Sequence, residues 1–267
     1  MNHISQPTPW VAKSGRLSPC RIGLISIAVC FAHFLACSKP NSPGLMVALL
    51  VDKSISADND QSLYRTETSK AMAALTEGDR FIIAPITASS GTDFRRMKEF
   101  VLPDSIGKMG WMDEPLAFKR KKEGHEKELQ EIRSSLRAAV DELLSAPPIS
   151  GKTAIFESLR TIAPIFAGEA KRRKILILLS DMVEDSEVAD FEGRILTPRF
   201  DESELTRQRN AGILPDLRDI SIYVGGILAS PPDRAAALEQ FWTAYFNATG
   251  ASLKPGRYAR VLNQFPQ

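Results

Sequence analysis

The sequence has 267 residues, of which 43% are hydrophobic and 25% charged, so it is long enough for one large α/β domain and has the composition of a globular protein. The formal net charge is +2, but residues 1–36 contain three basic and no acidic residues, which leaves 31 Lys and Arg against 32 Asp and Glu in the rest of the chain. A nearly neutral body excludes a general attraction to nucleic acid, and we expect no nucleic-acid partner.

All three cysteines lie within the first 37 residues, which excludes a disulfide framework in the body. In this region a basic stretch precedes a mostly apolar run over residues 22–36, a pattern typical of an export signal and short for a transmembrane helix. The run ends in Phe34-Leu-Ala-Cys37, which resembles a bacterial lipobox, so Cys37 is a candidate lipidation site. We expect a signal peptide over residues 1–37, a tether over residues 38–44, and an exported protein of the bacterial cell envelope, either a membrane-anchored lipoprotein or periplasmic. An ordinary signal peptide or an uncleaved signal anchor, with Cys37 incidental, is the alternative.

The first half of the body begins with a buried strand. Residues 45–51 form a continuous apolar run, which indicates a strand that is buried on both faces. A helix is expected from about residue 60 to residue 76, and a second strand over residues 80–87. Pro85 in that strand indicates an edge or a bulge. A third strand is expected over residues 94–102.

The second half continues the alternation of helices and strands. A charge run over residues 119–128 opens a long helix to about residue 144; it is either a basic patch for an anionic partner or, as we favour, a solvated helix face. Helices are then expected over residues 153–166, 202–211 and 233–247, and strands over residues 174–180, 219–227 and 258–262. The pattern predicts one α/β domain over residues 45–267, with a doubly wound, mostly parallel sheet and helices on both faces.

Oxygen-bearing side chains follow two of the predicted strands and precede one helix. Asp52, Ser54 and Ser56 come directly after the first strand, Thr153 begins a helix, and Asp181 follows the strand over residues 174–180. Ligands in open α/β sheets bind beyond the carboxyl ends of the strands. A carboxylate and two hydroxyls converging there would suit a hard cation such as Mg²⁺.

The order Asp-x-Ser-x-Ser, then Thr, then an Asp at a strand end resembles the metal-ion-dependent adhesion site of von Willebrand factor type A domains. The resemblance covers about residues 45–264 and implies the same Rossmann-like, doubly wound fold. It also implies a metal site formed by Asp52, Ser54, Ser56, Thr153 and Asp181, with Mg²⁺ as the expected ion and Mn²⁺ or Ca²⁺ as alternatives. In this family a carboxylate from a partner protein completes the site, so the resemblance implies adhesion or assembly and no enzyme activity.

Two departures from the family pattern carry expectations of their own. The family often has Gly after the third-loop aspartate, whereas this chain has Met182, a bulkier side chain beside the metal. The stretch over residues 86–148 is longer than a minimal domain needs and is expected to carry an insertion near the site. Additional carboxylates, Asp58, Asp60, Glu184, Asp185 and Glu187, either strengthen cation binding or belong to solvated loops.

Three other interpretations of the sequence are possible. Residues 146–153, which end in Gly151-Lys152-Thr153, satisfy a relaxed phosphate-loop pattern, but the preceding segment is predicted to be helical and Pro147 and Pro148 remove amide donors. A Ser-His-Asp hydrolase or a zinc site is disfavoured because His125 is the only histidine of the body. The main alternative is a metal-independent scaffold of the same fold, in which the serines form a turn and Asp181 caps a helix.

Overall fold

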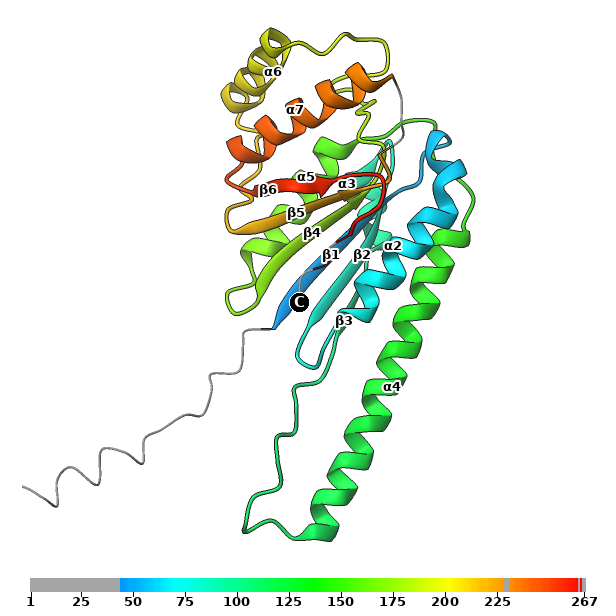
Figure 1. Ribbon diagram of the computed structural model, residues 1–267, viewed down its shortest axis with the longest axis vertical. Helices are drawn as coiled ribbons and strands as arrows, with labels where there is room; N and C mark the ends of the chain where they lie inside the picture. Colours follow the sequence, from blue (N-terminus) through cyan, green and yellow to red (C-terminus); the bar gives the residue numbers. More distant parts are fainter. Residues whose placement is uncertain (1–43, 228–230, 264, 266–267) are drawn as a thin grey trace, which may run out of the picture. The chain divides into compact units, whose positions relative to one another are not determined.

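A six-stranded sheet lies at the centre of the computed structural model, which describes residues 44–227, 231–263 and 265 (Figure 1). The strands are β1 (Leu45–Asp52), β2 (Arg80–Ile86), β3 (Lys98–Val101), β4 (Arg173–Leu179), β5 (Ile220–Gly225) and β6 (Ser252–Tyr258). Their order is β3-β2-β1-β4-β5-β6, and every neighbouring pair is parallel except β2 and β3. The central position of β1, with the chain winding outward in both directions, confirms the predicted doubly wound fold. The signal peptide, Cys37 and all of the expected tether except its last residue lie outside the described residues.

Helices cover both faces of this sheet, as predicted (Figure 1). They are α2 (Gln61–Ala73), α3 (Ser90–Asp93), α4 (Pro115–Ser145), α5 (Ile155–Ala167), α6 (Pro198–Asn210) and α7 (Pro232–Ala248), with short 3₁₀ helices η1 (Ser56–Asp60) and η2 (Phe94–Arg96). α2 and α4 pack on one face, and α5 and α7 pack on the other. α6 packs against α7. Within the described helices, no stretch combines the length and the apolar character that a membrane crossing requires.

The continuous apolar run of β1 follows from its central position. Leu45, Val47 and Leu49 face α2 and α4, whereas Met46 and Ala48 face α5 and α7, so alternate residues supply two different hydrophobic clusters. Both clusters consist wholly of residues between 45 and 265, and residues 43–267 form one compact unit. This part of the chain is therefore a compact unit with a hydrophobic core of its own.

Pro85 lies in an interior strand and in no bulge, but β3 does not extend alongside it, so one side of the strand is an edge at this position. β2 is flanked by β1 and β3, and Pro85 is in regular register with Val51. The carbonyl of Ile86 points toward β1, where it accepts a hydrogen bond from the Lys53 amide, so the preceding residue points toward the other side. On that side β3 pairs only as far as Ile83. The missing amide proton of Pro85 therefore faces a position that the sheet leaves unpaired.

Three sequence expectations need correction. Residues 90–96 form α3 and η2, so the third strand is shorter than the expected range of 94–102. The last strand, β6, precedes the expected range of 258–262 and meets it only at Tyr258. The additional length between residues 86 and 148 forms a loop and the 31-residue helix α4. The loop and the first turns of α4 lie at the end of the sheet where β1 begins, away from the candidate site rather than near it (Figure 1).

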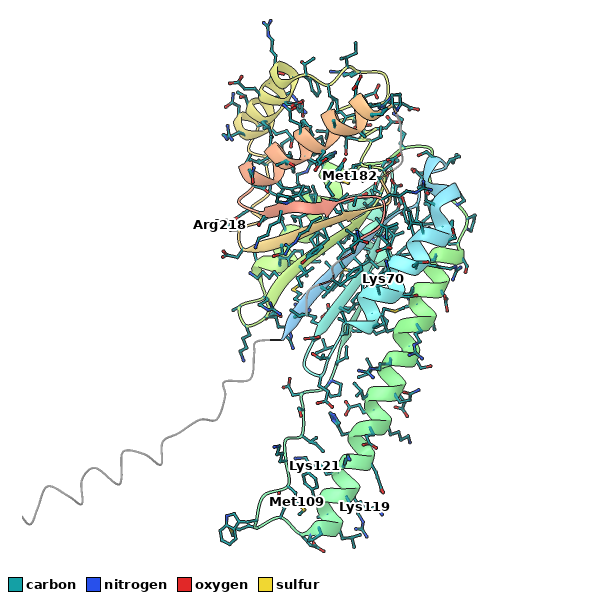
Figure 2. All side chains as sticks on the ribbon, viewed as in Figure 1. Lys70, Met109, Lys119, Lys121, Met182 and Arg218 are labelled. Carbon is teal, nitrogen blue, oxygen red and sulfur yellow. The ribbon has the colours of Figure 1, made fainter. Side chains whose placement is uncertain are left out.

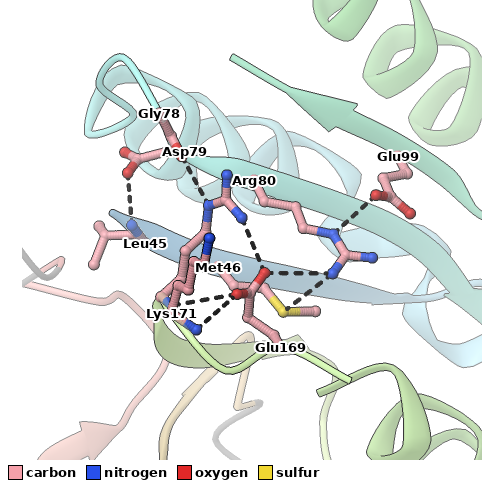
Figure 3. Close-up of polar contacts among 9 residues, drawn as sticks. Leu45, Met46, Gly78, Asp79, Arg80, Glu99, Glu169 and Lys171 are labelled. Carbon is pink, nitrogen blue, oxygen red and sulfur yellow. Dashed lines mark hydrogen bonds and ion pairs between the residues drawn. The ribbon is translucent and has the colours of Figure 1, made fainter. Parts of the chain in front are cut away.

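The end of the sheet where β1 begins is closed by a network of paired charges (Figure 3). Asp79 accepts a hydrogen bond from the Leu45 amide at 2.6 Å. Glu169 pairs with Arg172 at 3.0 Å and with Arg80 at 3.6 Å, and Arg80 also pairs with Glu99 at 2.8 Å. Each of these three carboxylates thus has a cationic or amide partner within the protein.

Candidate metal centre

The five predicted site residues meet at the carboxyl ends of the central strands. Asp52 ends β1, Ser54 and Ser56 follow it, Thr153 precedes α5, and Asp181 follows β4. Ser56, Thr153 and Asp181 line one depression of about 240 Å³. Asp52 and Ser54 are buried, with 0% and 2% of their surface exposed, and hydrogen bonds connect both to the same loop.

Asp52 is fixed by two hydrogen bonds from different loops. Its Oδ1 accepts a bond from the Ser54 amide at 2.9 Å, and its Oδ2 accepts one from the Ser180 hydroxyl at 2.7 Å. The hydroxyl oxygens of Ser54 and Ser56 are 3.0 Å apart and share a hydrogen bond. The first loop therefore presents its carboxylate and its hydroxyls in a defined arrangement before any ligand binds.

Backbone hydrogen bonds fasten the three loops to one another. The Ile55 amide donates to the Ser150 carbonyl at 3.0 Å, which joins the first loop to the second. The amide of Thr153 donates to the Asp185 carbonyl at 3.1 Å, and the Asp185 amide donates back at 2.9 Å, which joins the second loop to the third. Such reciprocal pairing makes the positions of the three loops interdependent.

Both carboxylates at the centre are less acidic than usual because they are buried. Burial raises the pKa of Asp52, and the hydrogen bonds from Ser54 and Ser180 offset only part of the effect. Burial also raises the pKa of Asp181 to about 6, with further contributions from the nearby charges of Asp52 and Asp60. Arg234, on α7, lowers the pKa of Asp181 but does not restore it. The hydrogen bonds and the nearby cations therefore offset only part of the cost of burying these two carboxylates.

Two further polar groups are buried around these carboxylates. Asp60 Oδ2 and the Tyr64 hydroxyl have no hydrogen-bond partner among the described residues, and the other oxygen of Asp60 has a long ion pair with Arg260 at 4.0 Å. Tyr64 lies close enough to Asp52, Asp60 and Asp181 that their charges raise the pKa of its phenol, in addition to the larger effect of burial. Unpaired acidic oxygens in a buried setting are stabilised by a cation, so the environment fits a metal ion.

The donor set fits a hard cation that retains water. Within the described part of the chain, no group of three or more His, Cys, Asp or Glu side chains is arranged to hold a metal. The candidate centre instead combines two carboxylates with three hydroxyls, all of them oxygen donors. Mg²⁺ typically binds to one or two carboxylates and keeps several waters, so these residues fit Mg²⁺ better than a metal that prefers nitrogen or sulfur.

Met182 does not lie beside the metal position as the sequence suggested. Its φ is +64°, a left-handed conformation that suits the glycine usual in the family, yet its side chain is fully buried within the α5 and α7 cluster. Its carbonyl accepts a hydrogen bond from Trp242 Nε1 at 2.8 Å. The Met182 side chain is therefore part of the core.

The additional carboxylates of the third loop have different roles. Glu184 is fully buried, and its Oε2 accepts bonds from the amides of Ile155 and Phe156, the first two residues of α5, at 2.7 and 3.1 Å. Glu184 therefore caps α5 and is not a solvated loop residue. The carboxylate of Asp185 pairs with Lys152 at 3.2 Å. Glu187 is exposed, as the solvated-loop interpretation expects.

The phosphate-loop alternative lacks the structure that it requires. The segment before Gly151 is the end of α4, not a strand, and Pro147 and Pro148 lie between. Lys152 pairs with Asp185. The helix that the sequence predicted before Gly151 is therefore confirmed, and it disfavours a phosphate loop here.

Three residues near the centre had no role assigned from the sequence. Ser180 bonds to Asp52, and Arg234 lines the depression. Lys53 is 1% exposed, and its ammonium donates to the Ala146 carbonyl at the end of α4 at 2.7 Å. These roles follow from the positions of the residues in the structure. The one available sequence signal was that Ser180 directly precedes the predicted site residue Asp181.

No model of a protein family matches the sequence, and no match to it is found among curated proteins. Similar solved structures include a von Willebrand factor type A domain from Catenulispora acidiphila, with 17% identity over 78% of this chain and 43% of that chain and a TM-score of 0.37. They also include the pilus adhesin SpaC from Lactobacillus rhamnosus GG, with 14% identity over 82% of this chain and 28% of that chain and a TM-score of 0.44. A third is a mutant of the PilB minor pilin from Streptococcus sanguinis, with 12% identity over 84% of this chain and 58% of that chain and a TM-score of 0.49. This chain therefore spans between 28% and 58% of the length of these three proteins.

Proposed function

We propose that this domain binds another protein through a divalent cation held by Asp52, Ser54, Ser56, Thr153 and Asp181. The observation that carries the proposal is the meeting of three loops at one depression, where the neighbouring groups offset only part of the cost of burying Asp52 and Asp181. The cation would supply positive charge and an attachment point for an oxygen ligand. Mg²⁺ is the proposed ion, and Mn²⁺ and Ca²⁺ are alternatives.

The surroundings of the depression favour an acidic side chain of a protein as the partner group. A volume of about 240 Å³ is below the roughly 300–1,000 Å³ of usual small-molecule sites, and it suits one inserted side chain. Arg234 lines the depression and would attract a carboxylate, whereas Asp185 and Glu192 would repel one. Binding of an acidic group should therefore depend on the cation, which reverses the local charge.

The chemistry of the site supports a binding module rather than an enzyme. The only histidine of the described chain, His125, lies on α4 and pairs with Glu77 at 2.8 Å, outside the residues that line the depression. We also propose that the protein is exported to the bacterial cell envelope and tethered through a lipid on Cys37, because of the basic and apolar pattern before that residue. Incorporation of labelled palmitate that is lost in Cys37→Ala would support the tether, and equal labelling would contradict it.

The metal is tested by thermal unfolding of residues 44–267 in EDTA and in millimolar Mg²⁺, Mn²⁺ or Ca²⁺. A ligand at 100 times its dissociation constant stabilises the folded state by about 2.7 kcal/mol, which raises the melting temperature by several degrees. Asp52→Asn and Asp181→Asn preserve side-chain size and should abolish the shift. Glu187→Gln, an exposed carboxylate of the same loop, should retain it.

The partner is tested by capture from a cell-envelope extract in Mg²⁺ and in EDTA. A protein retained only in Mg²⁺, and not by Asp52→Asn, supports the proposal. A protein retained equally in both conditions by wild type and variant favours the alternative, a metal-independent scaffold of the same fold.

A further inference from the structure

A second surface lies at the end of the molecule opposite the candidate metal centre. We name it the tip and define it as residues 106–122, which comprise the loop before α4 and its first two turns (Figure 2). Half of the eight large apolar side chains that the described chain leaves exposed lie within residues 109–116. They are Met109 (51% exposed), Trp111 (93%), Met112 (78%) and Leu116 (53%).

The apolar side chains of the tip are accompanied by basic ones. The tip contains five basic residues, Lys108, Lys119, Arg120, Lys121 and Lys122, and only two acidic ones, Asp113 and Glu114. All seven are exposed. Lys108, Arg120 and Lys121 form no ion pair within the described part of the chain, and those of Lys119 and Lys122 with later residues of α4 are long, at 3.8 and 3.6 Å. The tip therefore has a net positive charge beside its apolar side chains.

The tip extends beyond the hydrophobic core. The buried residues of α4 are Leu136, Val140 and Leu144, all in its second half. Nearer the tip, His125 pairs with Glu77 at 2.8 Å and so fixes the helix to the turn before β2. The first turns of α4 thus project from the sheet on a supported helix, and the core does not require the apolar side chains that they expose.

The strand connections place the tip at the end of the sheet where β1 begins. β3 is antiparallel and ends at Val101, opposite Arg80, the first residue of β2. The chain therefore leaves β3 at that end to form the tip. Gly44, which precedes β1, lies at the same end, whereas Asp52 lies at the other.

We propose that the tip binds to the surface of an anionic lipid bilayer. Trp111, Met112 and their apolar neighbours would enter the interfacial layer, where tryptophan is favoured, and the lysines and Arg120 would contact lipid phosphates. The long alkyl stems of lysine permit both contacts at once. Trp111 and Met112 protrude with most of their surface exposed, which suits a fluid bilayer better than a shaped protein partner. In this orientation the candidate metal centre faces away from the membrane.

The test uses residues 44–267, which form a compact unit with its own hydrophobic core, in EDTA so that the metal centre does not contribute. The probes are vesicles of phosphatidylcholine alone and with 30% phosphatidylglycerol, and the readouts are cosedimentation and tryptophan emission. This fragment has two tryptophans, Trp111 and the fully buried Trp242, so a blue shift on binding reports Trp111. We expect binding to anionic vesicles that weakens as salt rises.

Matched variants distinguish binding through the tip from non-specific adsorption to vesicles. Trp111→Ser with Met112→Ser should lower the partition coefficient by about tenfold or more, while Ile195→Ser, which removes another side chain that is 87% exposed, should not. Lys121→Glu should lower it by about fivefold or more, and Arg209→Glu on α6 should change it little. These exposed positions leave the core intact, so each variant should fold.

Two results would overturn the proposal. The first is equal vesicle binding by wild type and the Trp111→Ser/Met112→Ser variant, or no binding by either. The second is self-association of the wild type that the same variant abolishes, which would assign the tip to contact between copies. Neither result bears on the metal centre, whose test is independent.

Discussion

Ser180 and Asp52, at the ends of the neighbouring strands β4 and β1, are joined by a hydrogen bond of 2.7 Å, although they are 128 residues apart in the chain. The Ser180 hydroxyl oxygen also accepts a bond from the Met182 amide at 3.0 Å. One side chain thus orients the carboxylate of the first loop and the backbone of the third. We regard Ser180 as a positioning residue of the candidate centre.

Ser180→Ala should destabilise the domain by about 1–3 kcal/mol, because it leaves a buried amide and a buried carboxylate oxygen without this partner. The pKa of Asp52 should rise further, since the Ser180 bond lowers it. Mg²⁺ affinity should fall as a result. Urea unfolding and calorimetric titration with Mg²⁺ measure the two effects, with the exposed Ser135→Ala as the control. Unchanged Mg²⁺ affinity in a folded Ser180→Ala would remove Ser180 from the centre.

Glu184 should make the stability of the domain depend on pH. Burial raises its pKa to about 8 in the folded state, against an ordinary value of 4.5. Between these values the folded state retains a proton that the unfolded state has lost, so the free energy of unfolding should fall as pH rises from about 5 to about 8, by at most about 1.4 kcal/mol per pH unit.

Glu184→Gln should remove this component, because the amide stays neutral and its oxygen still accepts from the start of α5. Urea unfolding at pH 5, 6, 7 and 8 measures it as the difference between wild type and variant. Glu187→Gln, at an exposed position of the same loop, should keep the wild-type dependence. Parallel curves for wild type and Glu184→Gln would show that Glu184 is charged throughout this range.

At Met182, substitution by glycine should destabilise the domain less than substitution by alanine, the reverse of the usual order. Loss of its fully buried side chain should cost about 2–5 kcal/mol in Met182→Ala. Met182→Gly should be less destabilising by about 1 kcal/mol, because glycine adopts the left-handed backbone without strain. At Met46 in β1, which is equally buried and has no positive φ, glycine should instead be worse than alanine. Chemical denaturation of the four variants measures their free energies of unfolding. If glycine is worse than alanine at both sites, the prediction is wrong.

Any side chain at Gly226 should destabilise the domain because Tyr64 lies against this glycine. A Cβ there would be 2.5 Å from Tyr64 Cε1, and the φ of Gly226 is +91°. Gly226→Ala should cost about 2 kcal/mol or more, from backbone strain and displacement of the ring. Gly107 has a φ of +73° but nothing within 4 Å of a Cβ, so Gly107→Ala should show the backbone strain alone. Equal losses at both positions, measured by urea unfolding, would mean that Tyr64 moves aside freely.

The interior strands and the longest helix could be predicted because their sequence signals are local and strong. Residues 45–51 and 174–180 are apolar on both faces, since β1 and β4 lie at the centre of the sheet. The charge run over residues 119–128 lies on the exposed part of α4, a position that fits both a solvated face and a basic patch for an anionic partner; in proposing membrane binding we adopt the second interpretation for residues 119–122.

The edge strands could not be placed well for the opposite reason. β6 pairs only with β5, contains Pro255 and Gly256, and has mostly exposed or half-buried residues. It has neither an apolar run nor a clear alternation, so the sequence directed the prediction to the residues that follow. β3 has four residues and only Phe100 partly buried, which likewise gives little periodicity.

The candidate site could be nominated from the order of its motifs, but its internal connections could not. The bond from Ser180 to Asp52 and the position of Tyr64 depend on long-range packing. The direction of the Met182 side chain depends on a backbone angle that residue type alone argues against. Glu184 looked like one of several loop carboxylates, and only its burial distinguishes it.

α4 extends from the tip to the candidate metal centre. There the carbonyl of Ala146, directly after the helix, accepts a hydrogen bond from the ammonium of Lys53, the residue after Asp52. A helix of 31 residues is about 46 Å long and stiff along its axis. With the tip on a membrane and a protein at the metal centre, this helix would act as a strut that sets the height of the binding site above the bilayer. A proline at an exposed position in the middle of α4 would break the helix. The distance between the tip and the metal centre would then no longer be fixed, although neither contact surface would change.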